Sequence, residues 1–373
     1  MSTVREVVSA TVVVPLEQQT SIAKRAITER HYTLVRARDE NGLEGTGFCY
    51  GGSLAGHIVT VAVRDMLRHK VVGRDPHQVE AIWDDMFQES LLHGRRGSVM
   101  RAISAIDNAL WDLRAKQAGL PLYSLLGAYR HGTVPAYASG GYYVPGKTVE
   151  DLADEVRSYV EMGFPAVKIK VGRASIQEDV ARIRACRDAI GPDVPLFLDA
   201  NNAWRDAPSA IQAIRKFEEC GIDWMEEPVF PDDIEASAAI ARAVDVPIAT
   251  GEIEATRWGF QALIQAGAAS ILQPDAAVCG GITEWRRIAA LSAAHNVPLA
   301  PHWFADLHVH LVASTPNATW VEYFTDTRVL NFMRLLRSRL QTRNGQLVLP
   351  TGPGLGIEWD EEAIARWSVD GWR

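Results

Sequence analysis

Several kinds of segment are missing from this 373-residue chain, and each absence narrows its class. No run of about 20 apolar residues occurs, so we expect no membrane-spanning helix. The first residues, with Arg5 and Glu6 among them, lack the long apolar core of a secretory signal. Lys and Arg number 38 against 46 Asp and Glu, which gives a net charge of −8 with no long basic run. This balance argues against a nucleic-acid partner.

Cysteine and phosphate-binding glycine motifs are also scarce. The chain has four cysteines and no CxxC pair, so a disulfide scaffold is not expected and a reducing cytoplasm is the simplest location. Neither GxGxxG nor GxxxxGK[ST] follows a predicted strand, which disfavours an open, doubly wound nucleotide-binding sheet. What remains is an ordinary globular mixture, with 47% hydrophobic and 23% charged residues.

The first part of the chain, residues 1–130, predicts a small α+β domain. Segments rich in Val, Thr and Tyr alternate with a turn signal at Asp39–Gly42, where Asn-Gly suits a hairpin. Two stretches with apolar residues at helical spacing follow. The predicted elements are strands over 4–14, 31–38 and 45–50 and helices over 78–89 and 98–119.

The sequence pattern changes in residues 131–330, where short apolar runs alternate with predicted amphipathic helices. About eight such strand–helix units in 200 residues are typical of a (β/α)₈ barrel. The predicted strands are 134–139, 166–171, 194–199, 222–226, 248–252, 270–273, 297–300 and 319–323. The polar, Gly- and Pro-marked segment 331–373 is expected to pack back on the first domain.

Ionisable residues stand at the ends of consecutive predicted strands, where a barrel carries its active site. In chain order they are Lys168, Lys170, Asp199, Glu226, Glu252, Asp275, His302 and Glu322. Their spacing is about one strand–helix unit, so all of them are expected to meet at one barrel mouth. The alternative, that each one caps a helix or pairs with an arginine by itself, does not explain the series.

Three of these residues, Asp199, Glu226 and Glu252, predict a metal site. Buried carboxylates repel one another, and a divalent cation removes the repulsion. Hard oxygen ligands suit Mg²⁺, which keeps coordination sites open for water or a substrate carboxylate. We therefore expect Mg²⁺ as the cofactor.

The other strand-end residues predict proton transfer. Lys168 and Lys170 share a strand face at the period of two, and two close ammonium groups lower each other's pKa, so one can act as a base. Asp275 can hold the ring of His302 in one tautomer and raise its basicity. The alternatives are a salt-bridge lysine and a core histidine.

With these residues in view, the chain resembles the enolase superfamily, and within it the mandelate racemase subgroup (the mandelate racemase/muconate lactonizing enzyme family). The resemblance rests on motifs along nearly the whole chain, including AIDNALWDLRAKQAGLPLYSLLG at 105–127. The strand-end motifs are KIK, LDAN, EEP, TGE, QPD, APH and WVEYF. It implies an N-terminal capping domain over a modified barrel, (β/α)₇β.

The resemblance also implies the chemistry. Lys170 and the His302–Asp275 pair would be bases on opposite faces of a carboxylate substrate, and Lys168 and Glu322 would contact its carboxylate or enolate. Removal of the proton α to the carboxylate can lead to dehydration, or to racemisation, epimerisation or lactone cycloisomerisation. A protonated Glu322 could donate a hydrogen bond to the enolate.

For the substrate we predict a hydroxyl-rich acid sugar, an aldonate or an aldarate, and a dehydratase (a carbon–oxygen lyase). The segment 16–25, a predicted loop over the substrate's distal end, is too polar for a phenyl ring. Its Lys24 and Arg25 could pair with a second carboxylate, and Asn201 and Tyr50 are further candidate contacts. A Schiff-base aldolase and a non-catalytic sugar-acid-binding protein are the alternatives from other classes. The resemblance further implies a homo-oligomer.

Overall fold

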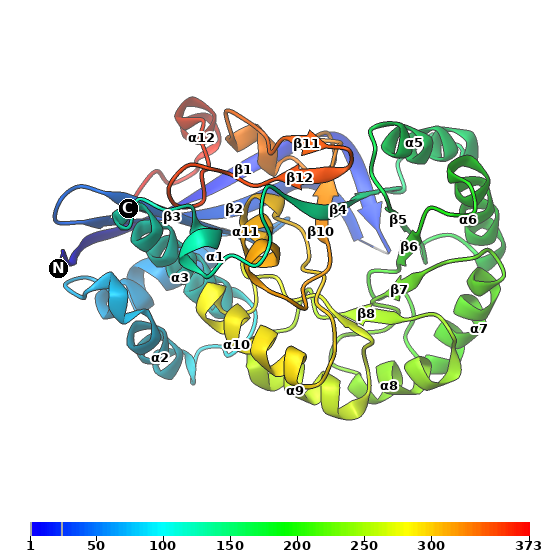
Figure 1. Cartoon of the computed structure of the whole chain (residues 1–373), viewed down its shortest axis with the longest axis horizontal. Helices are drawn as coiled ribbons and strands as arrows, with labels where there is room; N and C mark the ends of the chain where they lie inside the picture. The colour runs from blue at the N-terminus through cyan, green and yellow to red at the C-terminus, as the bar shows by residue number, and fades with distance from the viewer. Residues whose placement is uncertain (1, 24) are drawn as a thin grey trace.

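The computed structural model describes residues 2–23 and 25–373 of the chain. It begins with three antiparallel strands in the order β1 (Val4–Ile22), β2 (Arg25–Asp39) and β3 (Glu44–Gly52). The predicted turn between β2 and β3 is confirmed, with Asp39 Oδ1 accepting hydrogen bonds from the backbone N–H groups of Asn41 and Leu43 at 2.9 Å each. The first two strands extend well beyond their predicted bounds and form a long hairpin (Figure 1).

The sheet is covered by α1 (His57–Val61), the π-helical turn η1 (Ala62–Leu67) and α3 (Ser98–Gln117). The helices α2 (Val79–Ser90) and α4 (Leu122–Leu125) pack on α3. Helix α3 lies so close to β3 that a Cβ on Gly47 would fall 2.0 Å from the carbonyl oxygen of Ala105. Glycine is therefore required where this strand meets the helix.

The second unit is a closed parallel barrel. Its strands are β4 (Thr133–Gly140), β5 (Val167–Lys170), β6 (Leu196–Asp199), β7 (Trp224–Glu226), β8 (Ile248–Thr250), β9 (Ile271–Leu272), a single bridging residue at Leu299, and β10 (Val321–Phe324). Parallel pairing of β10 with β4 closes the circle. The predicted strand 297–300 is thus shorter than expected, because only Leu299 bridges to both neighbours.

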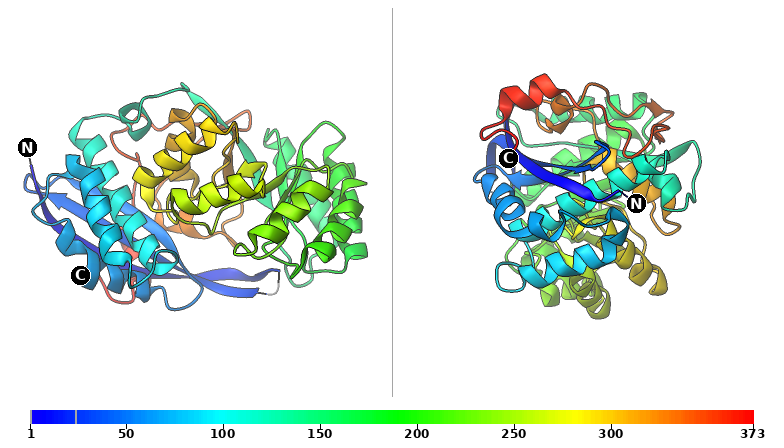
Figure 2. Two further views of the ribbon diagram at one scale, coloured as in Figure 1. Left: turned by 90° about the horizontal axis from the view of Figure 1, so that it is seen from below. Right: turned by 90° about the vertical axis from the view of Figure 1, so that its left-hand side faces the viewer.

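Helices follow these strands in turn and surround the barrel (Figures 1 and 2). They are α5 (Val149–Glu161), α6 (Ile176–Ile190), α7 (Ala207–Glu218), α8 (Ile234–Ala243), α9 (Thr256–Ala266), α10 (Gly281–Ala294) and α11 (Ala305–Ser314). The strand β10 is followed by the 3₁₀ turn η4 (Phe332–Leu335) instead of a helix packed on the barrel. The predicted (β/α)₇β architecture is confirmed.

The C-terminal segment contacts both units. Its strands β11 (Thr342–Arg343) and β12 (Gln346–Val348) form a hairpin, and β12 pairs with the barrel strand β4. Beyond helix α12 (Glu361–Trp367), the backbone of Val369 and Arg373 forms hydrogen bonds with β1. Figure 2 shows the C-terminus beside this strand. The expected contact with the capping domain is only part of its packing, and the domain boundaries at 130 and 330 stay predictions.

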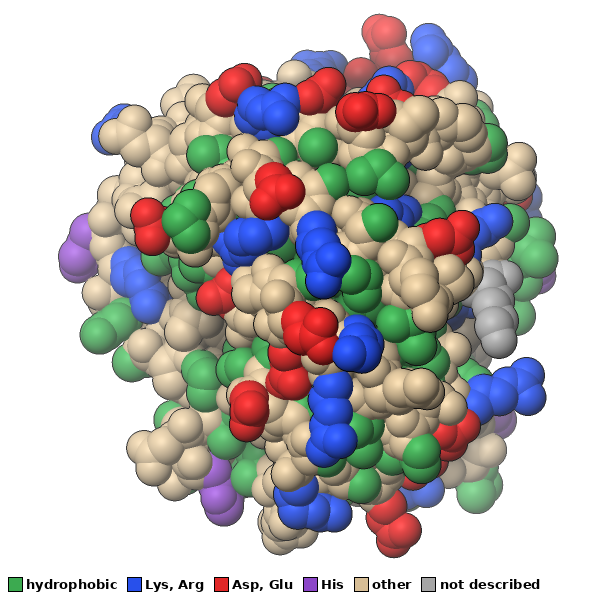
Figure 3. Space-filling view, turned by 90° about the vertical axis from the view of Figure 1, so that its right-hand side faces the viewer, with side chains coloured by type: hydrophobic (Ala, Val, Ile, Leu, Met, Phe, Trp, Pro, Cys, Tyr) green, Lys and Arg blue, Asp and Glu red, His purple; other side chains and the backbone are tan. Residues whose placement is uncertain are grey.

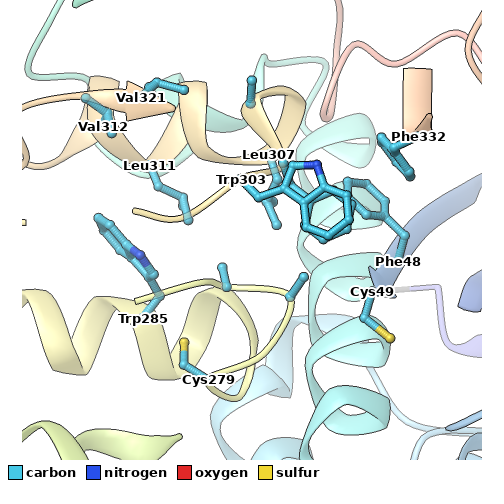
Figure 4. Packing of buried hydrophobic residues seen from close by; sticks show 14 of the residues in the cluster. Phe48, Cys49, Cys279, Trp285, Trp303, Leu307, Leu311, Val312, Val321 and Phe332 are labelled. Atoms are coloured by element: carbon cyan, nitrogen blue, oxygen red, sulfur yellow. The ribbon is translucent and has the colours of Figure 1, made fainter. Parts of the chain in front are cut away.

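Aromatic residues form the core where the two units meet (Figure 4). Trp303 and Phe304 stack with ring centroids 4.5 Å apart, and Phe48 of β3 lies 5.1 Å from Phe304 and 4.8 Å from Phe332. Inside the barrel, Phe197 and Trp224 stack at 3.7 Å and fill the interior. Because side chains fill the barrel below its mouth, the active site of such a barrel lies at the strand ends.

The outer surface of the barrel has mixed charge. Over the face shown in Figure 3, basic and acidic side chains are interspersed. Exposed ion pairs on the barrel helices include Lys216 with Glu219, 2.7 Å apart. Among the described residues, no helix is both long and apolar enough to cross a membrane.

Candidate active site

The register of the parallel strands brings the predicted strand-end residues to one level. Lys170 is the backbone partner of Asp199, and Asp199 is the partner of Glu226. Glu252 lies two residues beyond the end of β8, and His302 lies three residues beyond Leu299. The side chains predicted from separate strands are therefore neighbours at the barrel mouth.

Asp199, Glu226 and Glu252, the carboxylate triad, present oxygen atoms within 4.8 Å of one another. Asp199 and Glu226 are fully buried, and the side chain of Glu252 is 11% exposed. Burial and repulsion from the nearby carboxylates raise the pKa of Glu226 well above its ordinary value. Three close oxygen ligands whose charges repel fit a hard divalent cation such as Mg²⁺.

The two lysines are held by carboxylates, which differs from the predicted mutual effect. Lys168 Nζ lies 2.7 Å from Glu226 Oε2 and 2.7 Å from Glu322 Oε1, and the side chain is fully buried. Lys170 pairs with Asp199 and lies 5.3 Å from the ring centroid of Tyr142. Burial favours the neutral amines, but the carboxylates outweigh it and raise the pKa of both lysines.

The predicted His302–Asp275 pair, hereafter the dyad, is present in the structure. His302 Nδ1 lies 3.0 Å from Asp275 Oδ2, and Asp275 Oδ1 accepts a hydrogen bond from Ala277 N at 2.7 Å. His302 Nε2 lies 3.4 Å from Glu252 Oε2. Burial alone would lower the pKa of His302, but Glu252 and Asp275 together raise it to about 9. The imidazolium form is therefore favoured at neutral pH.

Glu322 is placed at the barrel mouth, but not in the protonated form. Its Oε2 accepts a hydrogen bond from Trp303 N at 2.8 Å, and its Oε1 contacts Lys168. Burial opposes ionisation, yet the Lys168 ammonium lowers the pKa of Glu322 to about 2. A protonated Glu322 does not fit this structure, because two donors already face the carboxylate.

A cavity of about 350 Å³ opens onto these groups. Lys170, Glu252, Asp275 and His302 line it from the barrel. The predicted substrate contacts Arg25, Tyr50 and Asn201 line it too, whereas Lys24 lies outside the described residues. Lys168 is not among the lining residues and lies buried behind Glu226 and Glu322.

The segment 16–25 is not the predicted loop. Leu16–Ile22 continues β1, and Thr20, Ser21 and Ile22 pair with β2 after an irregularity beyond Pro15. The polar side chains therefore lie on a hairpin that reaches from the capping sheet toward the barrel (Figure 2). Backbone pairing, which sequence polarity does not reveal, holds this segment extended.

Arg30, Arg101, Tyr142 and Trp303 are among the cavity-lining residues that the sequence did not single out. Strand alternation gives no signal for Arg30, because Arg38 has the same parity and a side chain that is 43% exposed. Trp303 could have been noted from its place next to His302.

Backbone strain gathers at the same strand ends. Positive φ values occur at Asn201 (+45°), Glu227 (+42°) and Trp303 (+51°), although each has a side chain. Such conformations are unfavourable for residues other than glycine and are typical of functional sites. They are the residues at which the chain turns around the triad and the dyad.

The capping domain holds the loop that carries Asp275. On α3, Ser104 Oγ accepts a hydrogen bond from Gly280 N at 2.9 Å, and Asn108 Nδ2 donates to Ala276 O at 3.0 Å. Asp107 accepts bonds from the backbone N–H of Thr283 at 2.8 Å and from its hydroxyl at 2.6 Å. The free N–H groups at the start of α10 are thus capped by another helix.

Two further histidines, His308 and His310, are buried on α11. His308 Nδ1 lies 2.9 Å from Trp303 O, and its Nε2 accepts a hydrogen bond from Ala276 N at 3.0 Å. It therefore connects the loops that carry the two members of the dyad. His310 Nε2 lies 3.0 Å from Leu355 O, outside the cavity.

Comparison with known proteins agrees with this geometry. Residues 4–127 match the family model described as "Mandelate racemase / muconate lactonizing enzyme, N-terminal domain", and residues 151–363 match "Enolase C-terminal domain-like". Over 92% of this chain and 84% of the relative, the sequence is 36% identical to L-talarate/galactarate dehydratase of Salmonella typhimurium. It is also 36% identical to 3,6-anhydro-alpha-L-galactonate cycloisomerase of Streptomyces coelicolor, over 90% of this chain and 91% of that one.

A solved structure is similar over nearly its whole length. It is that of a racemase from Streptomyces coelicolor with bound magnesium, and it superposes with a TM-score of 0.92 at 34% identity. The match covers 98% of this chain and 100% of the other.

Proposed function

Because the chain belongs to the enolase superfamily, in its mandelate racemase/muconate lactonizing enzyme family, we propose that it is an Mg²⁺-dependent acid sugar dehydratase. The proposed reaction removes the proton α to the substrate carboxylate and expels the β-hydroxyl as water, so that the enol formed becomes a 2-keto-3-deoxy acid. The relative that dehydrates talarate and galactarate supports this reaction class.

One observation carries the proposal. Lys170 and His302 line the same cavity, on opposite sides of the carboxylate triad. The triad stands at the ends of β6, β7 and β8. Lys170 lies on β5, before the triad, and His302 follows Leu299, after it. A substrate held at the triad would have one proton-transfer group on each side. Dehydration needs both, one to take the α-proton and one to protonate the leaving hydroxyl.

The residues of the triad would hold the metal ion. When bound, the ion would supply positive charge to offset the charge that develops on the substrate carboxylate. Lys168 and Glu322 form an ion pair beneath the cavity. The Lys168 ammonium would balance part of the negative charge of the triad, since it also contacts Glu226. Asn201, Tyr50 and Arg25 are proposed to contact the hydroxyls or the far end of the substrate.

We assign the two proton-transfer roles from the environments of the groups. His302 lines the cavity and is suited to protonate the leaving hydroxyl through Nε2, while Asp275 holds Nδ1. Lys170 on the other side would remove the α-proton in its amine form. Asp199, the carboxylate that raises the pKa of Lys170, is also a proposed ligand of the ion, so its charge would be shared when the ion is bound.

A second candidate function is cycloisomerisation or racemisation, which the cycloisomerase relative and the racemase structure favour. It begins with the same proton removal, and the second group then returns the proton to carbon. Both functions place the enzyme on a small sugar-acid substrate. The cytoplasmic location and a homo-oligomeric assembly stay proposals.

The deciding experiment is a screen of six-carbon aldonates and aldarates with Mg²⁺, with detection of 2-keto-3-deoxy acids. We expect at least one acid sugar to be dehydrated. Turnover of lactones or mandelate-like acids without dehydration of any acid sugar would contradict the proposal and favour the second function.

A further inference from the structure

Arg30 on β2 is a buried cation without a partner. Only 4% of the residue is exposed, and its Nε donates a hydrogen bond to Val329 O at 3.0 Å. Among the described residues, no carboxylate lies within ion-pair distance of Arg30, and its Nη1 and Nη2 donate no hydrogen bond to any of them. A guanidinium has five N–H donors, and burying its charge without an opposite charge is costly.

Arg30 reaches the candidate active site. It lines the cavity that contains Lys170 and His302. Its guanidinium lies 5.4 Å from the ring centroid of Tyr50 and 5.3 Å from that of Trp303, while the ring of His302 lies 5.8 Å beyond Trp303. The two aromatic rings and the bond to Val329 O hold the guanidinium at the cavity wall formed by the capping domain.

The two ends of the cavity differ in charge. The barrel end carries both signs, with Glu252 and Asp275 beside Lys170 and His302, whereas the charged residues of the capping end are Arg25, Arg30 and Arg101. Arg101 already donates to Tyr50 O at 2.9 Å, so Arg30 is the buried cation that is left for a ligand. One anionic group of a substrate would lie at the triad, and a second would find positive charge at the capping end.

We infer that Arg30 binds a second carboxylate and that the substrate is a sugar dicarboxylate of the aldarate type. This inference rests on the proposed function and narrows its substrate class. The planar guanidinium can form two parallel hydrogen bonds with a carboxylate, and burial strengthens them. Sequence reasoning placed this role on Lys24 and Arg25, whereas the burial and free Nη atoms of Arg30 make it the principal contact.

The test compares diacids with monoacids of the same configuration. For each six-carbon aldarate and its matching aldonate, kcat/KM for dehydration is measured with the wild type and with Arg30→Gln. We expect the diacid to monoacid ratio to fall by about 100-fold in Arg30→Gln, because two charge-assisted hydrogen bonds are lost. Arg30→Lys should restore part of the ratio, since it keeps the charge but not the planar fork.

The matched control is Arg38→Gln, which removes an arginine from the same strand. The side chain of Arg38 is 43% exposed and pairs with Glu6 and Glu44 instead of lining the cavity. Its diacid to monoacid ratio should equal that of the wild type. If Arg30→Gln does not fold, calorimetry of the Mg²⁺-loaded wild type with adipate and with hexanoate decides, and adipate should bind at least tenfold more tightly.

The outcomes separate this inference from the proposed function. Dehydration of both series with equal kcat/KM, and a ratio unchanged in Arg30→Gln, would overturn the role of Arg30 and leave the dehydratase in place. Adipate binding that depends on Arg30, without dehydration of any acid sugar, would support the anion site and overturn the function. If the enzyme prefers an aldonate 6-phosphate to the aldarate, the group that Arg30 binds is a phosphate and the inference of a second carboxylate is wrong.

Discussion

Removing either proton-transfer group should have a different effect on the two halves of the reaction. In His302→Asn, the group that protonates the leaving hydroxyl is lost, while Lys170 can still take the α-proton and exchange it with solvent. In Lys170→Ala, proton removal itself is lost. We therefore expect α-proton exchange without dehydration in the first variant, and neither process in the second.

The magnitude follows from the role of each group. A general acid or base contributes about 10²- to 10⁴-fold, which corresponds to about 3–5 kcal/mol of activation free energy. Lys170→Ala also leaves the fully buried Asp199 without its ion pair, and breaking a buried pair costs about 3–5 kcal/mol of folding free energy. The assay must therefore be run with Mg²⁺ at saturation and with thermal unfolding recorded for each variant.

The assay follows the substrate by proton NMR in D₂O. Loss of the α-proton signal reports exchange, and a keto-acid signal reports dehydration. His310→Asn is the matched control for loss of a buried imidazole, because His310 bonds to Leu355 O and does not line the cavity, so its turnover should stay within about twofold of wild type. Near wild-type dehydration in both His302→Asn and Lys170→Ala would refute the two-group reasoning. Exchange retained only in Lys170→Ala would reverse the assignment.

Three further predictions concern the metal, the folded state and the dyad. EDTA should abolish turnover, and added Mg²⁺ should restore it. Mg²⁺ at 100 times its Kd should add about 3 kcal/mol to the free energy of unfolding. If Glu226→Gln shows both effects unchanged, the metal site is wrong. Burial raises the pKa of Asp107 to about 7, so the native state keeps a proton that the unfolded state releases, and urea unfolding should show stability falling by about 4 kcal/mol from pH 4 to 7 and then levelling. The pKa values of Glu227 and Asp306 are raised as well, so in Asp107→Asn the fall should be smaller by about this amount. His308→Asn should lower kcat about tenfold with little change in KM and shift the pH profile, because it loosens both loops of the dyad; a loss of stability alone would make His308 merely structural.

The arrangement of the strand-end residues could be predicted from the sequence because two regular features fix it. Parallel pairing puts the ends of consecutive strands at one level, and alternation along a strand puts Lys168 and Lys170 on one face. Asp199 and Glu226 are direct backbone partners as a result. The candidate metal site therefore follows from spacing alone.

What spacing could not supply is the identity of each side chain's partner. The lysines were expected to lower each other's pKa, but each lies against a carboxylate from a neighbouring strand, and that contact decides the sign. Glu322 is ionised for the same reason. The length of the β1–β2 hairpin was also missed, because pairing between Thr20 and Ile27 depends on the partner strand and not on local polarity.

The capping-domain motif AIDNALW acquires a physical explanation from these contacts. Its polar residues Asp107 and Asn108 lie in an apolar helix and are fully buried, which would be costly unless each found partners. They find them in the backbone at the start of α10 and in the carbonyl of Ala276, directly after Asp275. The orientation of the dyad is thus held by a helix of the other unit. A barrel separated from its capping domain would keep the residues of the triad but lose both the capping end of the cavity and the support of Asp275.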